Sequence, residues 1–389
     1  MGVGVWAALA MIAMRMPVSA ASVEAAELGL PDPAAQRENF GTPEPEGTTA
    51  PLPDVFMRGR IEHLEQSKKD PEGLQGTLRI LDGPDVGAVV STEVHDAALL
   101  NRGTPLAVGE IVVVVKGFAF GGEGVYYIAD TYRVRSLVTM ILIFFALAIA
   151  LGRLRGLMSI IGLALTVGVI VWFVMPRIVA GHDPFRTCLL GGAFIATAAL
   201  YLAHGLHRRT AVAWVSTLLT LGASAVIAAV FVRSAHLFGM GSEEALFLPA
   251  SGFGHIDLRG LLLGGIVLGA LGILDDITTA QAAVVEELKS ANPNFTFHEL
   301  YRRGISVGRE HIAALINTLF LAYAGASLPL FLLFATRTGH PLWFVVNSEQ
   351  IAEEIVRTLV GSIGLMLAVP LTTALAAAYY ARRPVVSAS

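Results

Sequence analysis

The sequence predicts an α-helical polytopic membrane bundle of about seven spans, preceded by a small exported all-β domain of the OB or SH3-like barrel kind. Three observations lead to this prediction. Hydrophobic residues make up 54% of the 389-residue chain and charged residues only 15%, a balance typical of membrane proteins. Apolar runs long enough to cross a bilayer follow Arg135. Between residues 55 and 132, short β-branched runs alternate with turn residues instead.

The first 54 residues divide into two segments that precede both folds. Residues 1–21 resemble a signal peptide or signal anchor, because an apolar stretch is followed by the small residues Val18-Ser-Ala20. Residues 22–54 hold six prolines and seven acidic residues. Such a composition cannot bury enough apolar surface to offset its ordering entropy. We therefore expect an exported start followed by a disordered linker rich in proline and acids.

Residues 55–132 predict a soluble, extracytoplasmic β domain. Five apolar runs are separated by turn signals, among them Asp82-Gly-Pro-Asp85 and Gly121-Gly-Glu-Gly124. The expected strands are residues 58–63, 74–81, 88–94, 110–117 and 124–131. Five short strands in about 80 residues suit a small closed barrel. A barrel is a scaffold, so this fold leaves the function open.

Residues 133–381 form the predicted transmembrane domain, and residues 382–389 a cytoplasmic tail. The candidate spans are residues 136–152, 156–175, 187–203, 211–232, 261–285, 312–335 and 358–380. Ten Lys or Arg residues fall in the turns and tail on one side of these spans, against six on the other. The positive-inside rule makes the ten-residue side cytoplasmic. We therefore expect a multi-pass protein of the cell membrane with its β domain outside and its C-terminus in the cytoplasm.

The fifth predicted span meets a pair of carboxylates. Its apolar part, residues 261–274, is too short for a hydrocarbon core, which needs roughly 17–25 helical residues. Asp257 and Arg259 prevent extension backwards, so a complete span must include Asp275 and Asp276. Carboxylates inside a membrane helix are costly and usually face a protein interior or a water path. These two are therefore the leading candidates for a functional site.

Two structures are possible for the segment that contains Asp275 and Asp276. In one continuous helix, Asp275 shares a face with Thr279 and Glu286, a polar stripe suited to relaying a cation or a proton. Adjacent helix residues point about 100° apart, so one aspartate should face the interior, and we assign that place to Asp276. Alternatively Thr278-Thr-Ala-Gln281 forms a capping box, and one helix ends at the aspartates where another begins.

The last two predicted spans carry further candidates. Asn317, Thr318 and Tyr323 are polar residues inside the sixth span. Pro329 and Pro370 lack an N–H and each deprive a preceding carbonyl of its helical partner, so we expect helix breaks there. Broken helices line ion and substrate sites in transporters, although prolines also form plain kinks.

The sequence predicts no metal site, and it leaves any cofactor unknown. The single cysteine, Cys188, lies in an apolar run, which excludes a disulfide framework and a cysteine-based metal site. Zinc-hydrolase histidine spacing, a phosphate-binding loop and a nucleophile elbow are also absent from the sequence. The net charge of −4 and the lack of a Lys/Arg block argue against a nucleic-acid partner.

Several stretches resemble the YibE/F family of bacterial multi-pass membrane proteins. They are Gly269–Asp276, Gly308–Gly325, Ser327–Leu330, Asn347–Gly364 and Pro370–Thr373. The resemblance covers most of the chain after Val55 and implies an exported small domain followed by a membrane bundle. It also implies that the family's aspartate corresponds to Asp276 or Asp275, and that Glu310 stands where members often have an acid after a Gly-Arg dipeptide. The resemblance implies no biochemical activity.

These observations favour a permease-like membrane protein with Asp275, Asp276 and Asn317 near the pathway. No residue is assigned a catalytic role. One alternative is a membrane-embedded hydrolase that uses the aspartates, which is disfavoured because catalytic aspartates normally come from separate elements. Another is a non-catalytic assembly factor whose exported barrel binds a partner. The expected partners are the lipid bilayer and a small solute or ion, and a homo-oligomer is left open.

Overall fold

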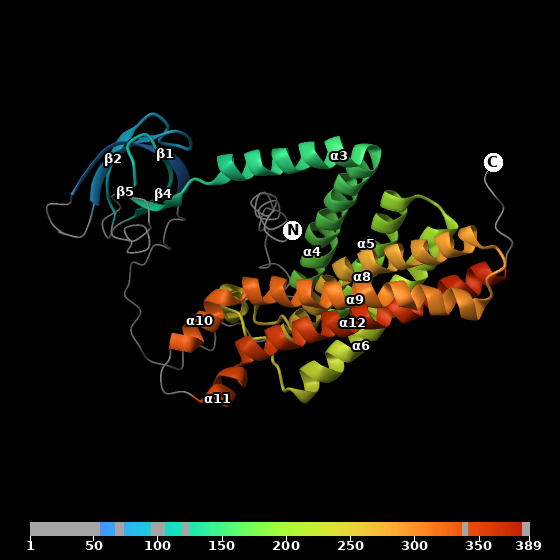
Figure 1. Cartoon of the computed structure of the whole chain (residues 1–389). Helices are drawn as coiled ribbons and strands as arrows, with labels where there is room; N and C mark the ends of the chain where they lie inside the picture. The colour runs from blue at the N-terminus through green and yellow to red at the C-terminus, as the bar shows by residue number, and fades with distance from the viewer. Residues whose placement is uncertain (1–54, 67–73, 95–105, 119–123, 337–340, 383–389) are drawn as a thin grey trace, which may run out of the picture. The chain divides into compact units, whose positions relative to one another are not determined.

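A computed structural model describes residues 55–66, 74–94, 106–118, 124–336 and 341–382, as Figure 1 shows. The predicted signal segment, the predicted linker and residues 383–389 of the predicted tail lie outside the described residues. The chain divides into two compact units along the sequence, with the division between Ile143 and Phe144. We call them the β unit and the helical unit and describe each by itself.

The β unit is an antiparallel sheet with strand order β3-β2-β1-β4-β5. Its strands are β1 (Val55–Gln66), β2 (Leu74–Ile80), β3 (Val89–Val94), β4 (Ile111–Phe118) and β5 (Gly124–Thr131). All five form close to where the alternating runs predict them. The two outer strands of this order are also joined, because Thr92 of β3 donates a hydrogen bond of 2.8 Å to the carbonyl of Tyr126 in β5.

Alternation along β1 separates an inner face from an outer face. Met57, Gly59 and Ile61 point inward and are buried, while Arg58 and Arg60 are exposed. The inner face packs on apolar side chains of the other strands and of the segment before β4. The buried core consists of Met57, Ile61, Leu78, Ile80, Leu106, Val112, Val114 and Ile128.

The remaining elements are helical. Three long helices come first: α3 (Val134–Val169), α5 (Pro184–His204) and α6 (Arg208–Ser234). Two more form the second half of the bundle with α9 (Phe297–Ala326): α8 (Leu258–Ala291) and α12 (Glu349–Ala381). Shorter segments are η1 (Ile170–Val174), α4 (Met175–Val179), α7 (Glu243–Leu248), η2 (Pro249–Phe253), α10 (Leu328–Thr336) and α11 (Leu342–Val346).

Five helical stretches in the described residues are long and apolar enough to cross a membrane. They are Val134–Val179, Pro184–His204, Arg208–Ser234, Leu258–Ala291 and Glu349–Ala381. The first two predicted spans fall in the first of these stretches, where Arg153 leaves helical geometry with φ 53°. The sixth predicted span is divided between α9 and α10 at Ser327. Several membrane-spanning helices are therefore supported, and the count of seven stays a prediction.

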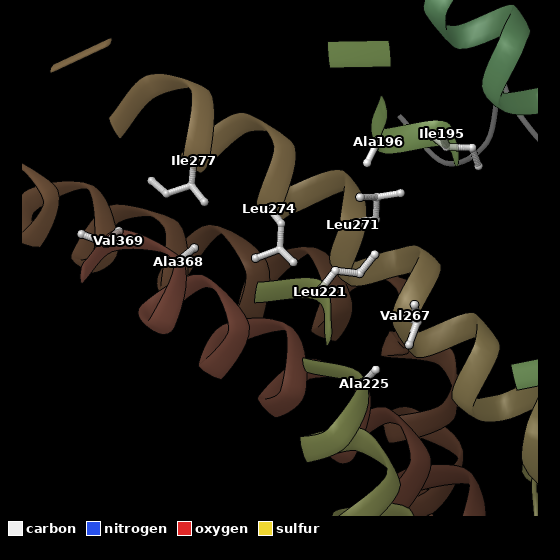
Figure 2. Close-up of a cluster of buried hydrophobic side chains, with 10 residues drawn as sticks. All are labelled: Ile195, Ala196, Leu221, Ala225, Val267, Leu271, Leu274, Ile277, Ala368 and Val369. Atoms are coloured by element: carbon white, nitrogen blue, oxygen red, sulfur yellow. The ribbon is translucent and has the colours of Figure 1, made fainter. Parts of the chain in front are cut away.

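Helix α8 is the centre of the helical unit, since it packs against α5, α6, α9 and α12. Figure 2 shows the middle of this packing, where buried side chains from four helices meet. They are Ile195, Ala196, Leu221, Ala225, Val267, Leu271, Leu274, Ile277, Ala368 and Val369. Small residues permit the close approach: a Cβ atom on Gly264 would lie 2.6 Å from Sγ of Cys188. Cys188 is thus a packed small residue at the contact of α5 with α8.

Candidate functional site

Helix α8 runs without interruption through both aspartates. The capping box considered at Thr278 does not form, because its hydroxyl lies 2.7 Å from that of Thr217 in α6. The hydroxyl of Thr279 donates back to the carbonyl of Asp275 at 2.9 Å. Both threonines therefore hydrogen-bond as residues of a helix interior. The local sequence resembles a cap, but packing against α6 keeps the helix intact.

The two aspartates face different surroundings. Asp275 is half-buried, and its Oδ1 atom is covered by protein without a hydrogen-bond partner among the described residues. Asp276 is exposed on the helical unit. Our expectation that Asp276 faces the interior is therefore wrong, and Asp275 takes that place. The angle of about 100° between neighbouring residues was anticipated, but the rotation of α8 about its axis is set by packing that the sequence does not specify.

Glu286 lies on α8 as expected but has partners of its own. Its carboxylate accepts a hydrogen bond of 2.7 Å from the hydroxyl of Tyr380 and lies 3.5 Å from the guanidinium of Arg209. These contacts tie α8 to α12 and α6 near one end of the bundle. Glu286 is about 16 Å from Asp275 along the helix, at a rise of about 1.5 Å per residue.

The candidates on α9 lie apart from the buried aspartate. Asn317 and Thr318 are exposed on the helical unit, and Thr318 donates to the carbonyl of Ala314 at 3.0 Å. Tyr323 is half-buried, and its hydroxyl lies 3.6 Å from where a Cβ atom on Gly269 of α8 would stand. Of these three residues, Tyr323 alone is brought close to α8 by a contact in the described structure.

The two prolines behave differently. Helix α9 ends at Ala326 and α10 begins at Leu328, so the chain is interrupted two residues before Pro329. Pro370 lies inside α12, which continues to Ala381. The helix break expected at Pro370 is therefore wrong. Pro370 removes one backbone donor, and the buried contacts on both sides of it hold the helix together.

Sequence reasoning missed the buried polar residues of α6, α8 and α12. Gln281 of α8 is completely buried, and its amide nitrogen donates to the carbonyl of Gly304 at 2.8 Å and to the hydroxyl of Thr373 at 2.7 Å. We call the polar groups of α6, α8 and α12 the polar seam. It comprises Ser216, Thr217, Thr220, Ser224, Asp275, Thr278, Gln281, Thr372 and Thr373.

The polar seam contains oxygens that the described residues leave unpaired. Besides Asp275 Oδ1 they are Ser224 Oγ, Gln281 Oε1 and Thr372 Oγ1. Buried polar atoms are rarely left without partners, so such a concentration marks the seam as unusual. A signal for it exists in the sequence. Gly304 and Gly308 are four residues apart on α9, and a Cβ atom on Gly308 would lie 3.1 Å from Gln281 Oε1.

A cavity of about 390 Å³ lies at the end of the helical unit where α5 and α8 begin and α6 ends. Four charged residues line it, namely Asp183, Arg233, Asp257 and Arg259. No ion pair joins any two of these four in the described structure. Arg259 donates to the carbonyl of Leu237 at 2.9 Å and lies over the ring of Phe238. The cavity thus presents charges of both signs beside an aromatic wall.

Two carboxylates of α12 hold the loop beside this cavity. Glu349 Oε1 accepts the backbone N–H groups of Phe238, Gly239 and Met240 at 2.5, 2.9 and 3.3 Å. Glu353 accepts that of Gly241 at 2.9 Å. Four successive amides are therefore used by side chains of the protein itself. We call this contact the glutamate clamp.

No group of three or more His, Cys, Asp or Glu side chains suited to a metal ion occurs in the part of the chain that the structure describes. Asp275 instead offers one carboxylate, with the hydroxyl groups of Thr278 and Thr279 about one helical turn away on the same helix. Such a set can bind and release a proton, or hold a cation together with water.

Comparisons with known proteins agree with the resemblance in the sequence. The family model for YibE/F-like proteins matches residues 140–382, which is more than half of the chain and extends from α3 to the end of α12. No curated protein and no solved structure matches the chain. The match includes the whole polar seam and leaves the β unit outside it except for residues 140–143 of α3. The chain therefore belongs to the family of YibE/F-like proteins.

Proposed function

We propose that this membrane protein is a permease in which Asp275 reversibly binds a proton or a cation. The observation that carries the proposal is the Oδ1 atom of Asp275, which is covered by protein and has no hydrogen-bond partner in the described part of the chain. Burying an ionised oxygen without a partner is strongly unfavourable. A proton or a cation at this oxygen removes the penalty, so occupancy of the site and stability are linked.

The position of Asp275 along α8 supports a site at membrane depth. The charged residues Arg259 and Glu286 are about 40 Å apart along the helix axis, and a hydrocarbon core of about 30 Å fits between them. Asp275 lies about 16 Å from Glu286 on this axis. Intramembrane carboxylates that face a protein interior commonly belong to proton or ion pathways.

The polar seam supports a path for the proton or cation. Thr278 is three residues from Asp275 and adjoins it on the helix surface, and its hydroxyl contacts Thr217. Gln281, a further turn along, joins α8 to Thr373 of α12. The cavity lined by Asp183, Arg233, Asp257 and Arg259, which we call the mixed-charge cavity, lies at the start of α8. Its volume is within the usual range for small-molecule sites, so it would admit a small solute at the end of α8 opposite Glu286.

The geometry does not favour a hydrolase. Asp275 and Asp276 are adjacent on one helix and face different surroundings, whereas a catalytic dyad needs two carboxylates that share a site. Glu286 is engaged by Arg209 and Tyr380. We therefore keep the permease as the proposed function.

We further propose that the β unit is a closed barrel of the OB kind on the extracytoplasmic side. The strand order β3-β2-β1-β4-β5 and the bond between Thr92 and Tyr126 support closure. The excess of basic residues on the opposite side of the spans supports the orientation. Single cysteines at Asn101 and Ser387, probed with an impermeant thiol reagent on intact cells, test the orientation. Labelling at 387 but not at 101 would contradict it.

The experiment on Asp275 measures thermal unfolding of the full chain in lipid nanodiscs while pH, Na⁺ and K⁺ are varied separately. We expect the wild-type midpoint to depend on pH or on one of the cations, and Asp275→Asn to lose that dependence. Asp276→Asn is the matched control, because the same chemical change is made on the exposed side of α8, and it should behave like the wild type. An Asp275→Asn protein with the full wild-type dependence would refute the proposal.

A further inference from the structure

A second cavity lies within the β unit, at the base of α3. Its volume is about 530 Å³. It is lined by Arg58, Arg60, Ile111, Tyr132, Val134, Arg135, Val138 and Thr139. Sequence reasoning gave these residues no role, and the proposed permease function does not use them.

The fold brings three arginines to this cavity. Arg58 and Arg60 stand two residues apart on β1, so the strand alternation places both on the outer face, where they are exposed. The chain leaves β5 at Thr131 and enters α3 at Val134. Arg135 is thereby set in the first turn of α3, opposite the outer face of β1.

The cavity carries positive charge that the protein does not compensate. Arg58 lies 2.7 Å from the carboxylate of Asp82 and covers the ring of Tyr132. Arg60 and Arg135 form no hydrogen bond or ion pair through their side chains with any residue that the structure describes. No carboxylate is among the residues that line the cavity. Two guanidinium groups are therefore available to a ligand.

Other arginines of the β unit show that this is not the general pattern. Arg133 makes two bonds to the carboxylate of Asp130, at 2.5 and 2.8 Å, and Arg79 lies 2.5 Å from Glu62. These neighbours are paired although they are exposed. The unpaired arginines are the ones that share the cavity with Arg58.

The position of the cavity identifies the kind of ligand. Val134 and Val138 supply an apolar wall from α3, and the exposed side chains that follow, such as Met140 and Leu142, are apolar. Val134 also begins the most apolar of the candidate membrane spans. A lipid headgroup next to this helix would meet the guanidinium groups while its acyl chains follow the apolar surface.

We propose that this cavity binds the phosphate headgroup of an anionic phospholipid. Guanidinium groups bind phosphate oxygens through paired, charge-assisted hydrogen bonds, and basic pockets beside membrane helices are suited to lipid headgroups. Arg60 and Arg135 bind the phosphate. Val134 and Val138 distinguish a lipid from a free phosphate, because only the lipid brings apolar chains to them.

The test measures lipid retention by native mass spectrometry of the full chain. The protein is released from vesicles of equal phosphatidylcholine and phosphatidylglycerol, and the bound lipids are counted. We expect wild type to retain phosphatidylglycerol preferentially, and Arg60→Gln with Arg135→Gln to retain it about 30-fold more weakly, the effect of losing two basic residues at an anionic membrane surface. Arg79→Gln with Arg133→Gln removes the same charge outside the cavity and should retain the lipid.

Two further measurements complete the test. One distinguishes a lipid headgroup from free phosphate, and the other uses a second variant in case the first does not fold. Inorganic phosphate at millimolar concentration should not displace phosphatidylglycerol from wild type, and displacement would overturn the lipid as ligand. Equal loss in the two double variants would overturn the cavity as the site. The double variant Arg60→Lys with Arg135→Lys keeps the positive charge, and it replaces the Gln double variant in the test if the Gln double variant unfolds. This protein should retain more phosphatidylglycerol than phosphatidylcholine, and equal retention of the two would also overturn the proposal.

Discussion

The β unit and the helical unit treat their polar groups in opposite ways. In the β unit the buried cluster is apolar, and Asp85, near the edge, accepts hydrogen bonds from Lys116 at 2.8 Å and from Tyr126 at 2.9 Å. The helical unit has an apolar cluster too, but its interior also contains the polar seam, where oxygens of Ser224, Asp275, Gln281 and Thr372 lack partners among the described residues. A scaffold gains stability by pairing its polar groups. Unpaired buried groups lower stability and persist where function requires them.

The largest expected effect tests the apolar side of this comparison. Leu78 is fully buried in the β unit, and Leu78→Ala should destabilise that unit by about 3 kcal/mol through lost burial and the cavity left behind. Pulse proteolysis of the full chain across urea concentrations measures the change. Val86→Ala, at an exposed position, should shift stability by less than about 0.5 kcal/mol. Equal effects would mean that the cluster around Leu78 is not the core.

A smaller loss is expected at the paired part of the polar seam. Gln281→Leu removes the donor to Gly304 and Thr373 and leaves their oxygens buried, at a cost of about 2 kcal/mol. Thr373→Val should lose less in the Gln281→Leu background than in wild type, because the two residues share a hydrogen bond. Unfolding in mixed detergent micelles measures both. Additive effects would separate Gln281 from Thr373.

Asp275→Leu should raise stability, in contrast to the two substitutions above, which lower it. Replacing a carboxylate whose oxygen has no partner with an apolar side chain should raise the stability of the helical unit by about 1 kcal/mol. The same micelle assay measures the stability. Glu286→Leu is the control of opposite sign. Glu286 has partners in Arg209 and Tyr380, so its replacement should lower the stability of the helical unit. A strongly destabilised Asp275→Leu protein would make Asp275 a structural residue.

The smallest effect concerns pH and the β unit. The hydrogen bonds from Lys116 and Tyr126 lower the pKa of Asp85 below its ordinary value of 3.8. The contribution of the ionised carboxylate is therefore complete above the ordinary pKa and is lost as pH falls through the lowered one. Asp85→Asn should remove this part of the acid sensitivity. Pulse proteolysis between about pH 6 and pH 3 compares the variant with wild type, and identical acid sensitivity would count against the contact.

Local pattern was enough for the strands and for the location of the acidic segment, since both depend on the period of apolar residues. It was not enough to choose between Asp275 and Asp276, because the choice depends on how α8 is rotated against α5, α6 and α12. Thr278 and Gln281 have the spacing of a capping box, and only the neighbouring Thr217 and Thr373 show that they belong to a helix interior. The glutamate clamp joins residues about 110 positions apart, which no local pattern reveals.

The glutamate clamp attaches the loop after α6 to the first turns of α12. One oxygen of Glu349 binds three successive amides, and Glu353 binds the next. Phe238 in that loop covers Arg259 at the start of α8, in the wall of the mixed-charge cavity. The loop thus contacts both α12 and the start of α8. A tilt of α12 against α8 would therefore shift Phe238 relative to Arg259 and alter the wall of the cavity.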